Sequence, residues 1–108
     1  MLRVLNKIYE ITNLMPIPLK TTKAEKCIVY KFWQTAAYTY RLELRIIDFS
    51  MAGSEETASA IIKNICNFGD SNKIDGIPSI VLNGGGILED IETNTIQRIL
   101  YFDLIIKE

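Results

Sequence analysis

Histidine is absent from this chain of 108 residues, and cysteine occurs only twice. Without histidine, Ser-His and Cys-His catalytic pairs and every imidazole-ligated metal site are excluded. We expect Cys27 and Cys66 to be buried free thiols and not a disulfide, because the expected compartment is reducing and a buried free cysteine behaves as a small hydrophobic residue.

An excess of charge of one sign is also missing. Twelve Lys and Arg residues oppose thirteen Asp and Glu residues, which gives a formal net charge of −1. A protein that binds DNA tightly neutralises many phosphates with basic side chains, and this balance does not supply them. We therefore expect no specific nucleic-acid binding by the isolated chain.

Long hydrophobic runs are lacking as well. No apolar run approaches the roughly 20 residues of a membrane helix, and the first ten residues interleave charged with apolar positions, unlike a signal peptide. We expect no membrane partner and a cytoplasmic product with Met1 as its natural start. The length and the 48% apolar content predict a single domain over residues 1–108.

The segment Tyr38–Phe49 alternates apolar and polar residues with a period of two, which predicts a strand with one buried face. Tyr40, Leu42, Leu44 and Ile46 point one way, and Arg41, Glu43 and Arg45 point the other. The apolar face needs a covering layer. Residues 2–12 supply one, since their apolar positions occupy half of a helical wheel.

A second helix is expected after Phe49, with Ser54 as its N-cap, Glu55 and Glu56 in its first turn and Gly69 at its end. Its apolar face contains Ile62 and Ile65, and replacing either with Asp should unfold the domain. The other expected strands are Cys27–Trp33, Ile77–Asn83 and Thr95–Ile106. The predicted fold class is therefore α+β, a mainly antiparallel sheet of about four strands with two packed helices, in the order α-β-β-α-β-β.

Several segments allow a functional and a structural interpretation. The lysines of residues 19–26 fit a phosphate contact or a solvated loop, and we favour the loop. Asp70–Gly76 begins like a calcium loop but lacks the required ligands, because its fifth position is Ile74 and its twelfth is Val81. Gly84–Gly86 has no P-loop continuation and predicts a bend or a bulge. The acidic residues Glu89, Asp90 and Glu92 fit a cation contact or a solvated loop, and we favour the loop. No catalytic, cofactor-binding or metal-binding residue is expected.

Apolar and aromatic residues occupy both faces of the final strand, Thr95–Ile106. This predicts either an interior strand or a strand whose second face is hidden by another subunit. The aromatic residues of the first hairpin could stack on single-stranded nucleic acid, but few basic residues accompany them, which favours cross-strand packing or a protein interface. The candidate interface residues are Trp33, Tyr38, Tyr40, Ile99, Tyr101 and Ile105.

The segments RLELRII at 41–47, NFGD at 67–70 and KIDGIPSIVLNGGGILEDIETNTIQRILYFDLI at 73–105 resemble a known group. They are similar to the small tail-completion proteins of long-tailed bacteriophages and prophages, also called tail terminators, minor tail proteins or tail-to-head joining proteins. The resemblance covers about the last two-thirds of the chain. It implies a compact α+β subunit without catalytic activity, assembled as a ring that caps the tail tube and meets the head connector.

The leading hypothesis is that the protein is a structural component of the virion. We expect it in the virion, and in the host cytoplasm during assembly. Its expected partners are copies of itself, the tail-tube protein and the head–tail connector protein. The alternative is a small cytoplasmic binding or regulatory domain with a ferredoxin-like arrangement. A hydrolase or nuclease would depend on carboxylates such as Asp70, Asp75, Glu89 and Asp90, which form no recognised constellation.

Overall fold

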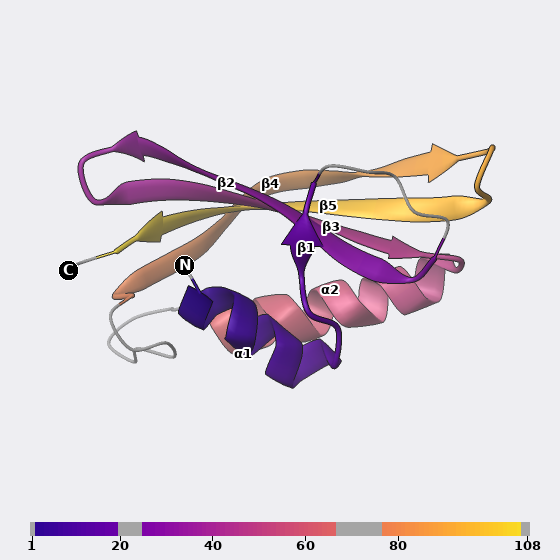
Figure 1. Ribbon diagram of the computed structural model, residues 1–108, viewed down its shortest axis with the longest axis horizontal. Helices are drawn as coiled ribbons and strands as arrows, with labels where there is room; N and C mark the ends of the chain where they lie inside the picture. Colours follow the sequence, from indigo (N-terminus) through magenta and orange to yellow (C-terminus); the bar gives the residue numbers. More distant parts are fainter. Residues whose placement is uncertain (1, 20–24, 67–76, 107–108) are drawn as a thin grey trace.

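A twisted five-stranded sheet backed by two helices makes up the computed structural model, which describes residues 2–19, 25–66 and 77–106 (Figure 1). The sheet and helices extend over 42 × 23 × 21 Å. In chain order, the elements are α1 (Leu2–Thr12), β1 (Ile17–Pro18), β2 (Cys27–Ala36), β3 (Thr39–Asp48), α2 (Met51–Ile65), β4 (Ser79–Asp90) and β5 (Thr95–Ile105).

The strand order is β1-β2-β3-β5-β4, with β1 parallel to β2 and every other neighbouring pair antiparallel. The α+β class and the two helices are confirmed. The prediction of about four antiparallel strands in the order α-β-β-α-β-β was wrong, because β1 adds a fifth strand and makes the sheet mixed. β1 has only two residues, Ile17 and Pro18, and is too short for a periodic pattern.

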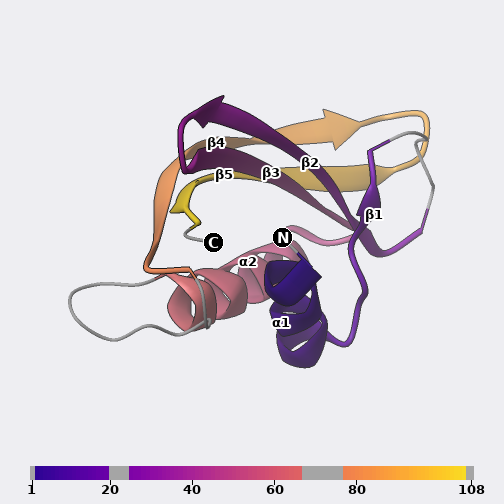
Figure 2. The same ribbon diagram turned by 60° about the vertical axis from the view of Figure 1, so that its left-hand side comes forward.

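Both helices lie on the same face of the sheet (Figure 2). They enclose a core to which β3 contributes Leu42, Leu44 and Ile46, as their alternation predicted. Cys27 and Cys66 are thiols and do not form a disulfide with each other, as expected; Cys66 is buried as predicted, whereas Cys27 is only half-buried. Other residues of this core are Val4 and Ile8 of α1, Ala58, Ile61 and Ile65 of α2, and Ile80, Leu100, Phe102 and Leu104 of β4 and β5.

The second helix begins one turn earlier than predicted. Ser50 is its N-cap and accepts a hydrogen bond from the Gly53 amide at 2.9 Å. Ser54, the predicted cap, is buried inside the helix and donates to the Met51 carbonyl at 2.8 Å. The prediction was wrong because Ser-Glu-Glu resembles a helix start more than Ser-Met-Ala does. The predicted end at Gly69 lies outside the described residues.

Gly84–Gly86 lies inside β4, and the chain reverses later, through residues 91–94. The predicted strand Ile77–Asn83 was therefore too short, and Glu89 and Asp90 belong to the strand instead of a loop. The bulge interpretation of the glycines is confirmed by a register shift between Leu82 and Gly85. Gly84 has a φ of 100°, a conformation that glycine adopts without strain.

The final strand, β5, lies between β3 and β4, which confirms that it is an interior strand. It ends at Ile105, one residue before the predicted boundary. The β2–β3 hairpin is longer than predicted and turns at Ala37 and Tyr38. The tips of the β2–β3 and β4–β5 hairpins project beyond the helices at opposite ends of the sheet (Figure 1).

Candidate interaction surface

Neither helix lies over the second face of the sheet, which we call the outer face (Figure 2). It is formed by residues that alternate with those of the core. Strand register places Trp33 beside Arg41, Arg41 beside Asp103, and Asp103 beside Val81. The outer face also includes Lys31, Glu43, Arg45, Gln97, Ile99, Tyr101 and Ile105.

Ion pairs between neighbouring positions cross the outer face. Arg41 Nε donates to Asp103 Oδ1 at 3.0 Å and joins β3 to β5. The Asn83 amide donates to Asp103 Oδ2 at 2.6 Å and adds β4 to the same group. The hydrogen bond from Arg41 lowers the pKa of Asp103 below its ordinary value, assisted by Asn83 and opposed by partial desolvation. Asp103 therefore stays ionised and holds three strands together.

A second charged pair lies two residues further along β3. Arg45 Nε donates to Glu43 Oε2 at 3.0 Å, and Arg45 Nη1 donates to Gln97 Oε1 at 3.2 Å. Glu43 is only 7% exposed although neither helix covers it. Burying a carboxylate is unfavourable unless it is paired, and Arg45 supplies the partner. The charged side chains of the outer face thus pair largely with one another within the sheet.

The aromatic and aliphatic side chains between these pairs are the part of the outer face suited to a protein partner. Lys31 Nζ lies 5.4 Å from the centre of the Trp33 ring, a cation–π distance. Trp33 and Tyr101 are half-buried, and Ile105 is exposed. Large side chains of this kind surrounded by polar groups are typical of interface centres.

The candidate interface residues fall into two groups. Trp33, Ile99, Tyr101 and Ile105 share the outer face, although Ile99 is only 8% exposed and offers little area. Tyr40 projects from the opposite face of β3 and stacks on Phe32, with ring centroids 5.2 Å apart. Tyr38 occupies the hairpin turn with a φ of 62° and is 63% exposed. Tyr38 and Tyr40 instead line a pocket of about 220 Å³ beside Ile106.

Four exposed residues of β4 were not predicted as candidates: Val81, Leu82, Ile87 and Leu88. For Ile87 and Leu88, the reason is the early strand end assigned at the glycine triplet. Val81 and Leu82 lie within the predicted strand, whose place at the edge of the sheet was not predicted. The signal was present in the sequence, because Ile-Val-Leu precedes the glycines and Ile-Leu follows them.

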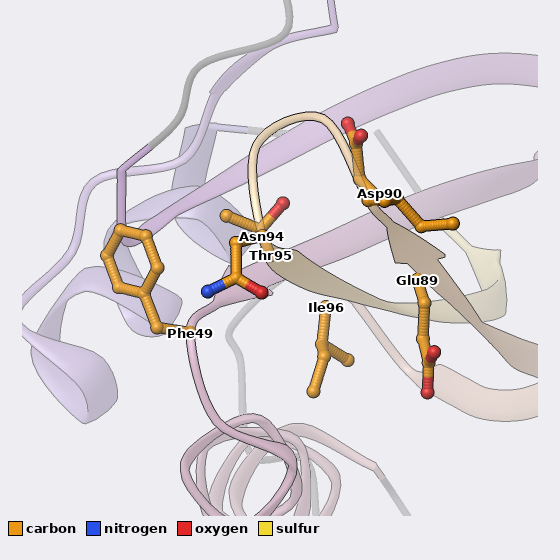
Figure 3. A pocket seen from close by; sticks show the side chains of 7 residues that line it. Phe49, Glu89, Asp90, Asn94, Thr95 and Ile96 are labelled. Carbon is orange, nitrogen blue, oxygen red and sulfur yellow. The ribbon is translucent and has the colours of Figure 1, made fainter.

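A pocket of about 300 Å³ lies where the β4–β5 turn approaches Phe49 (Figure 3). Glu89 and Asp90 are its carboxylates. Asp90 Oδ1 accepts backbone hydrogen bonds from Glu92 at 3.1 Å and Thr93 at 3.4 Å, so this side chain shapes the turn. Among the described residues, no group of three or more Cys, Asp or Glu side chains could hold a metal. Asp70 and Asp75 lie outside them.

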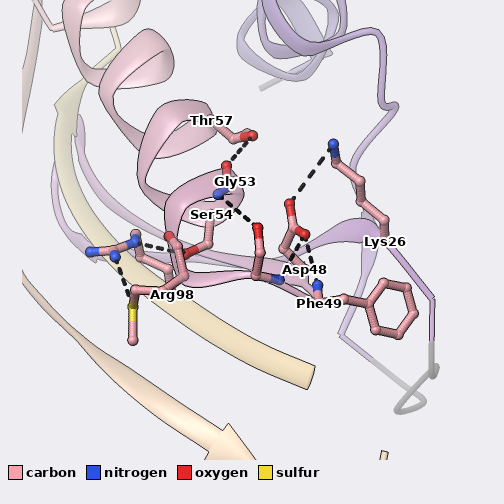
Figure 4. A network of polar contacts seen from close by, with 9 residues as sticks. Lys26, Asp48, Phe49, Gly53, Ser54, Thr57 and Arg98 are labelled. Atoms are coloured by element: carbon pink, nitrogen blue, oxygen red, sulfur yellow. Dashed lines mark hydrogen bonds and ion pairs between the residues drawn. The ribbon is translucent and has the colours of Figure 1, made fainter. Parts of the chain in front are cut away.

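Polar contacts tie α2 to the sheet (Figure 4). Asp48 Oδ1 accepts from the amides of Phe49 at 2.7 Å and Ser50 at 3.2 Å. Asp48 Oδ2 is buried, accepts no hydrogen bond among the described residues and lies 3.8 Å from Lys26 Nζ. Arg98 Nε donates to Ser54 Oγ at 3.2 Å, which links β5 to the helix. These side chains position α2, and we assign them a structural role. Lys26 belongs to the segment 19–26, which was predicted to be a loop; the other two lysines of that segment, Lys20 and Lys23, lie outside the described residues.

Comparison with known proteins adds no family: no family model matches the chain, and no curated protein matches it significantly. Within the described residues, neither helix is long and apolar enough to cross a membrane.

Proposed function

We propose that the protein is a tail-completion subunit of a long-tailed bacteriophage or prophage, which caps the tail tube and docks to the head connector. The observation that supports this function is the outer face, a sheet surface left open by both helices and carrying Trp33, Tyr101 and Ile105 among paired charges. Such a surface suits a protein partner better than a small ligand.

The shape of the molecule supports the same proposal. The two hairpins project in opposite directions past the helix layer (Figure 1). A subunit about 42 Å long with extensions at both ends can contact neighbours on two sides, as a ring or a joint between two structures requires. The sequence resemblance to tail-completion proteins supplies the identity of those neighbours.

The formal net charge of −1 is compatible with a position along a DNA channel, since counterion release would provide little attraction. The role is structural and involves no catalytic step. Assembly on the tail would place the protein in the virion, after a stage in the host cytoplasm.

The direct test is the mass of the purified chain in solution, with and without the tail-tube protein of the same phage or prophage. The proposal expects a complex with the tail tube, or a larger self-assembly in its presence. Electron microscopy of a lysate lacking this product should show tails of irregular length or heads without tails. Normal virions in that lysate would overturn the proposal.

A binding or regulatory domain is the second candidate function, favoured by the pocket that Tyr38 and Tyr40 line. The ferredoxin-like arrangement first associated with it differs from this structure, because the helix α1 comes before the first strand and two strands, instead of one, follow α2. If the purified chain bound neither the tail-tube protein nor the connector protein, this second candidate function would be favoured.

A further inference from the structure

The strand β4 forms one edge of the sheet and carries exposed apolar side chains on both of its faces. Register with β5 places Val81 and Leu88 on the outer face, opposite Asp103 and Gln97. It places Leu82 and Ile87 on the helix face, opposite Phe102 and Arg98. These four β4 side chains are 39%, 51%, 41% and 45% exposed, respectively.

The sequence of β4 contains no Lys, Arg or Pro, the residues that commonly protect an edge strand from pairing. The other edge differs. There β1 covers part of β2 and contains Pro18, and Lys31 of β2 is exposed. The edge of β4 is therefore the one better suited to accept another strand.

We propose that two copies of the chain pair through antiparallel β4 strands, about a two-fold axis that is perpendicular to the sheet and passes between Gly84 and Gly85. In this register, Val81 of one copy lies opposite Leu88 of the other on the outer face. Leu82 lies opposite Ile87 on the helix face. The contact extends each five-stranded sheet into one continuous sheet with all helices on the same side.

The bulge determines which registers are consistent. The extra residue between Leu82 and Gly85 shifts the alternation of faces, so Val81 and Leu88 share a face although their numbers differ in parity. An axis through Gly85 would place Leu82 of the helix face opposite Leu88 of the outer face. The proposed axis avoids this mismatch, because it pairs each face of one copy with the same face of the other.

Shifting the two-fold axis by one residue in either direction still pairs each face with the same face of the other copy, but it separates the apolar side chains. An axis between Gly85 and Gly86 places Val81 opposite Asp90 and Leu82 opposite Glu89. An axis between Asn83 and Gly84 places Val81 and Leu82 opposite glycines. Of these three face-matched registers, only the proposed one pairs all four exposed apolar side chains with each other, and such cross-strand pairs stabilise a sheet.

Charge is compatible with the same register. Glu89 of one copy lies opposite Ile80 of the other, and Asp90 lies opposite Ser79, so the acidic residues stay at opposite ends of the contact. An eight-residue pairing is about 27 Å long. A strip about 10 Å wide then buries on the order of 300 Å² per copy, well below the roughly 800 Å² of a standard stable interface. The expected dimer is therefore weak and concentration-dependent.

This pairing is independent of the proposed tail-completion function. It uses a sheet edge and leaves Trp33, Tyr101 and Ile105 of the outer face available for other contacts. A ring of subunits would be built by contacts other than this two-fold one.

Sedimentation velocity of the full chain from about 10 μM to about 1 mM tests the pairing, because a contact of this size dissociates upon dilution. We expect a shift from monomer to dimer over this range. Leu88→Lys should raise the dimer dissociation constant by about tenfold or more. The matched control is Ile91→Lys, which makes the same kind of change at a turn residue that is 92% exposed and lies outside the paired segment.

Disulfide trapping tests the register in a Cys27→Ser background, with the buried Cys66 retained. Val81→Cys and Leu88→Cys chains should cross-link when mixed under oxidising conditions. Each variant alone should not, because identical positions would lie about 24 Å apart across the axis. Val81→Cys mixed with Asp90→Cys, the neighbouring register, is the control that should give little product.

Three results would overturn the pairing: a monomer throughout the concentration range, a dimer that tolerates Leu88→Lys as well as Ile91→Lys, or cross-linking that prefers position 90. A monomer whose tail-tube binding is lost in Leu88→Lys would assign the edge to that partner instead. In that case self-pairing fails while tail completion stands, so the two proposals are distinguishable.

Discussion

The guanidinium of Arg41 lies 3.0 Å from the carboxylate of Asp103, in a pair that joins β3 to β5 on the outer face. Asn83 donates to the other carboxylate oxygen, so the same group also holds β4. A surface organised by such pairs is fixed before a partner arrives, which reduces the ordering cost of association.

Asp103→Asn should reduce the free energy of unfolding by about 0.2–1 kcal/mol near neutral pH, the range of partly exposed ion pairs. The folded-state pKa of Asp103 lies below its ordinary value of 3.8, so its contribution is present above that pH and is lost as the pH falls through the folded-state value. Urea unfolding of both proteins from pH 7 downward measures this. A difference that stays constant well below pH 3.8 would contradict the assignment.

The glycines of β4 should differ sharply in their tolerance of a side chain. A Cβ at Gly85 would collide with the backbone carbonyl oxygen of Ile99, whereas a Cβ at Gly86 would meet nothing within 4 Å. We expect Gly85→Ala to destabilise the protein by about 1–3 kcal/mol, and Gly86→Ala to change stability by less than about 0.5 kcal/mol. Thermal unfolding of the two variants tests the bulge. Equal effects would mean that the register around Gly85 is different.

Ser50→Ala should cost about 0.5–2 kcal/mol, because the Gly53 amide at the start of α2 loses its acceptor. Glu55→Ala serves as a control in the same helix, since Glu55 is exposed and lies beyond the first turn. Chemical denaturation compares them. If Ser50→Ala left stability unchanged, the helix would have to begin elsewhere, for example at the Ser54 predicted from sequence.

The buried face of α2 gives a graded prediction. Ile65 is fully buried, whereas Ile62 is half-buried at the margin of the core. Ile65→Asp should prevent folding, since an unpaired carboxylate would enter an apolar interior. Ile62→Asp should destabilise the domain less, and circular dichroism would show a folded variant with a lower melting temperature. If Ile62→Asp were unfolded and Ile65→Asp were folded, the face of α2 that packs on the core would have been assigned incorrectly.

The parts of the fold predictable from sequence were those with a clear period. The alternation in β3 and the wheel of α1 each describe an amphipathic surface, and such surfaces are specified locally. The two-residue β1 could not be found because its pairing with Val29 and Tyr30 depends on residues far along the chain. The glycines of β4 were misread because glycine marks both turns and bulges, and only the pairing with β5 distinguishes them.

The candidate interface residues were predictable as a class but not as a surface. Period-two alternation separates Tyr40 from Trp33 once the hairpin register is known, and that register includes an irregularity between Gln34 and Ala36. No local signal in the sequence specifies this shift. Tyr38 and Tyr40 consequently lie at the tip of the hairpin, away from Tyr101 at the centre of the sheet.

The same separation makes the interface testable with two aromatic-to-alanine substitutions. Trp33→Ala should weaken binding to the tail-tube or connector protein by about tenfold or more, as truncating a central aromatic anchor commonly does, while changing stability little. Tyr40→Ala should act mainly on stability, by about 0.5–1.5 kcal/mol beyond its lost burial, because it removes the stack on Phe32. Calorimetric titration and thermal unfolding of both variants separate the two effects. If Tyr40→Ala abolished binding while Trp33→Ala left it intact, the partner surface would be the hairpin-tip pocket, and the outer face would have to be abandoned as the docking site.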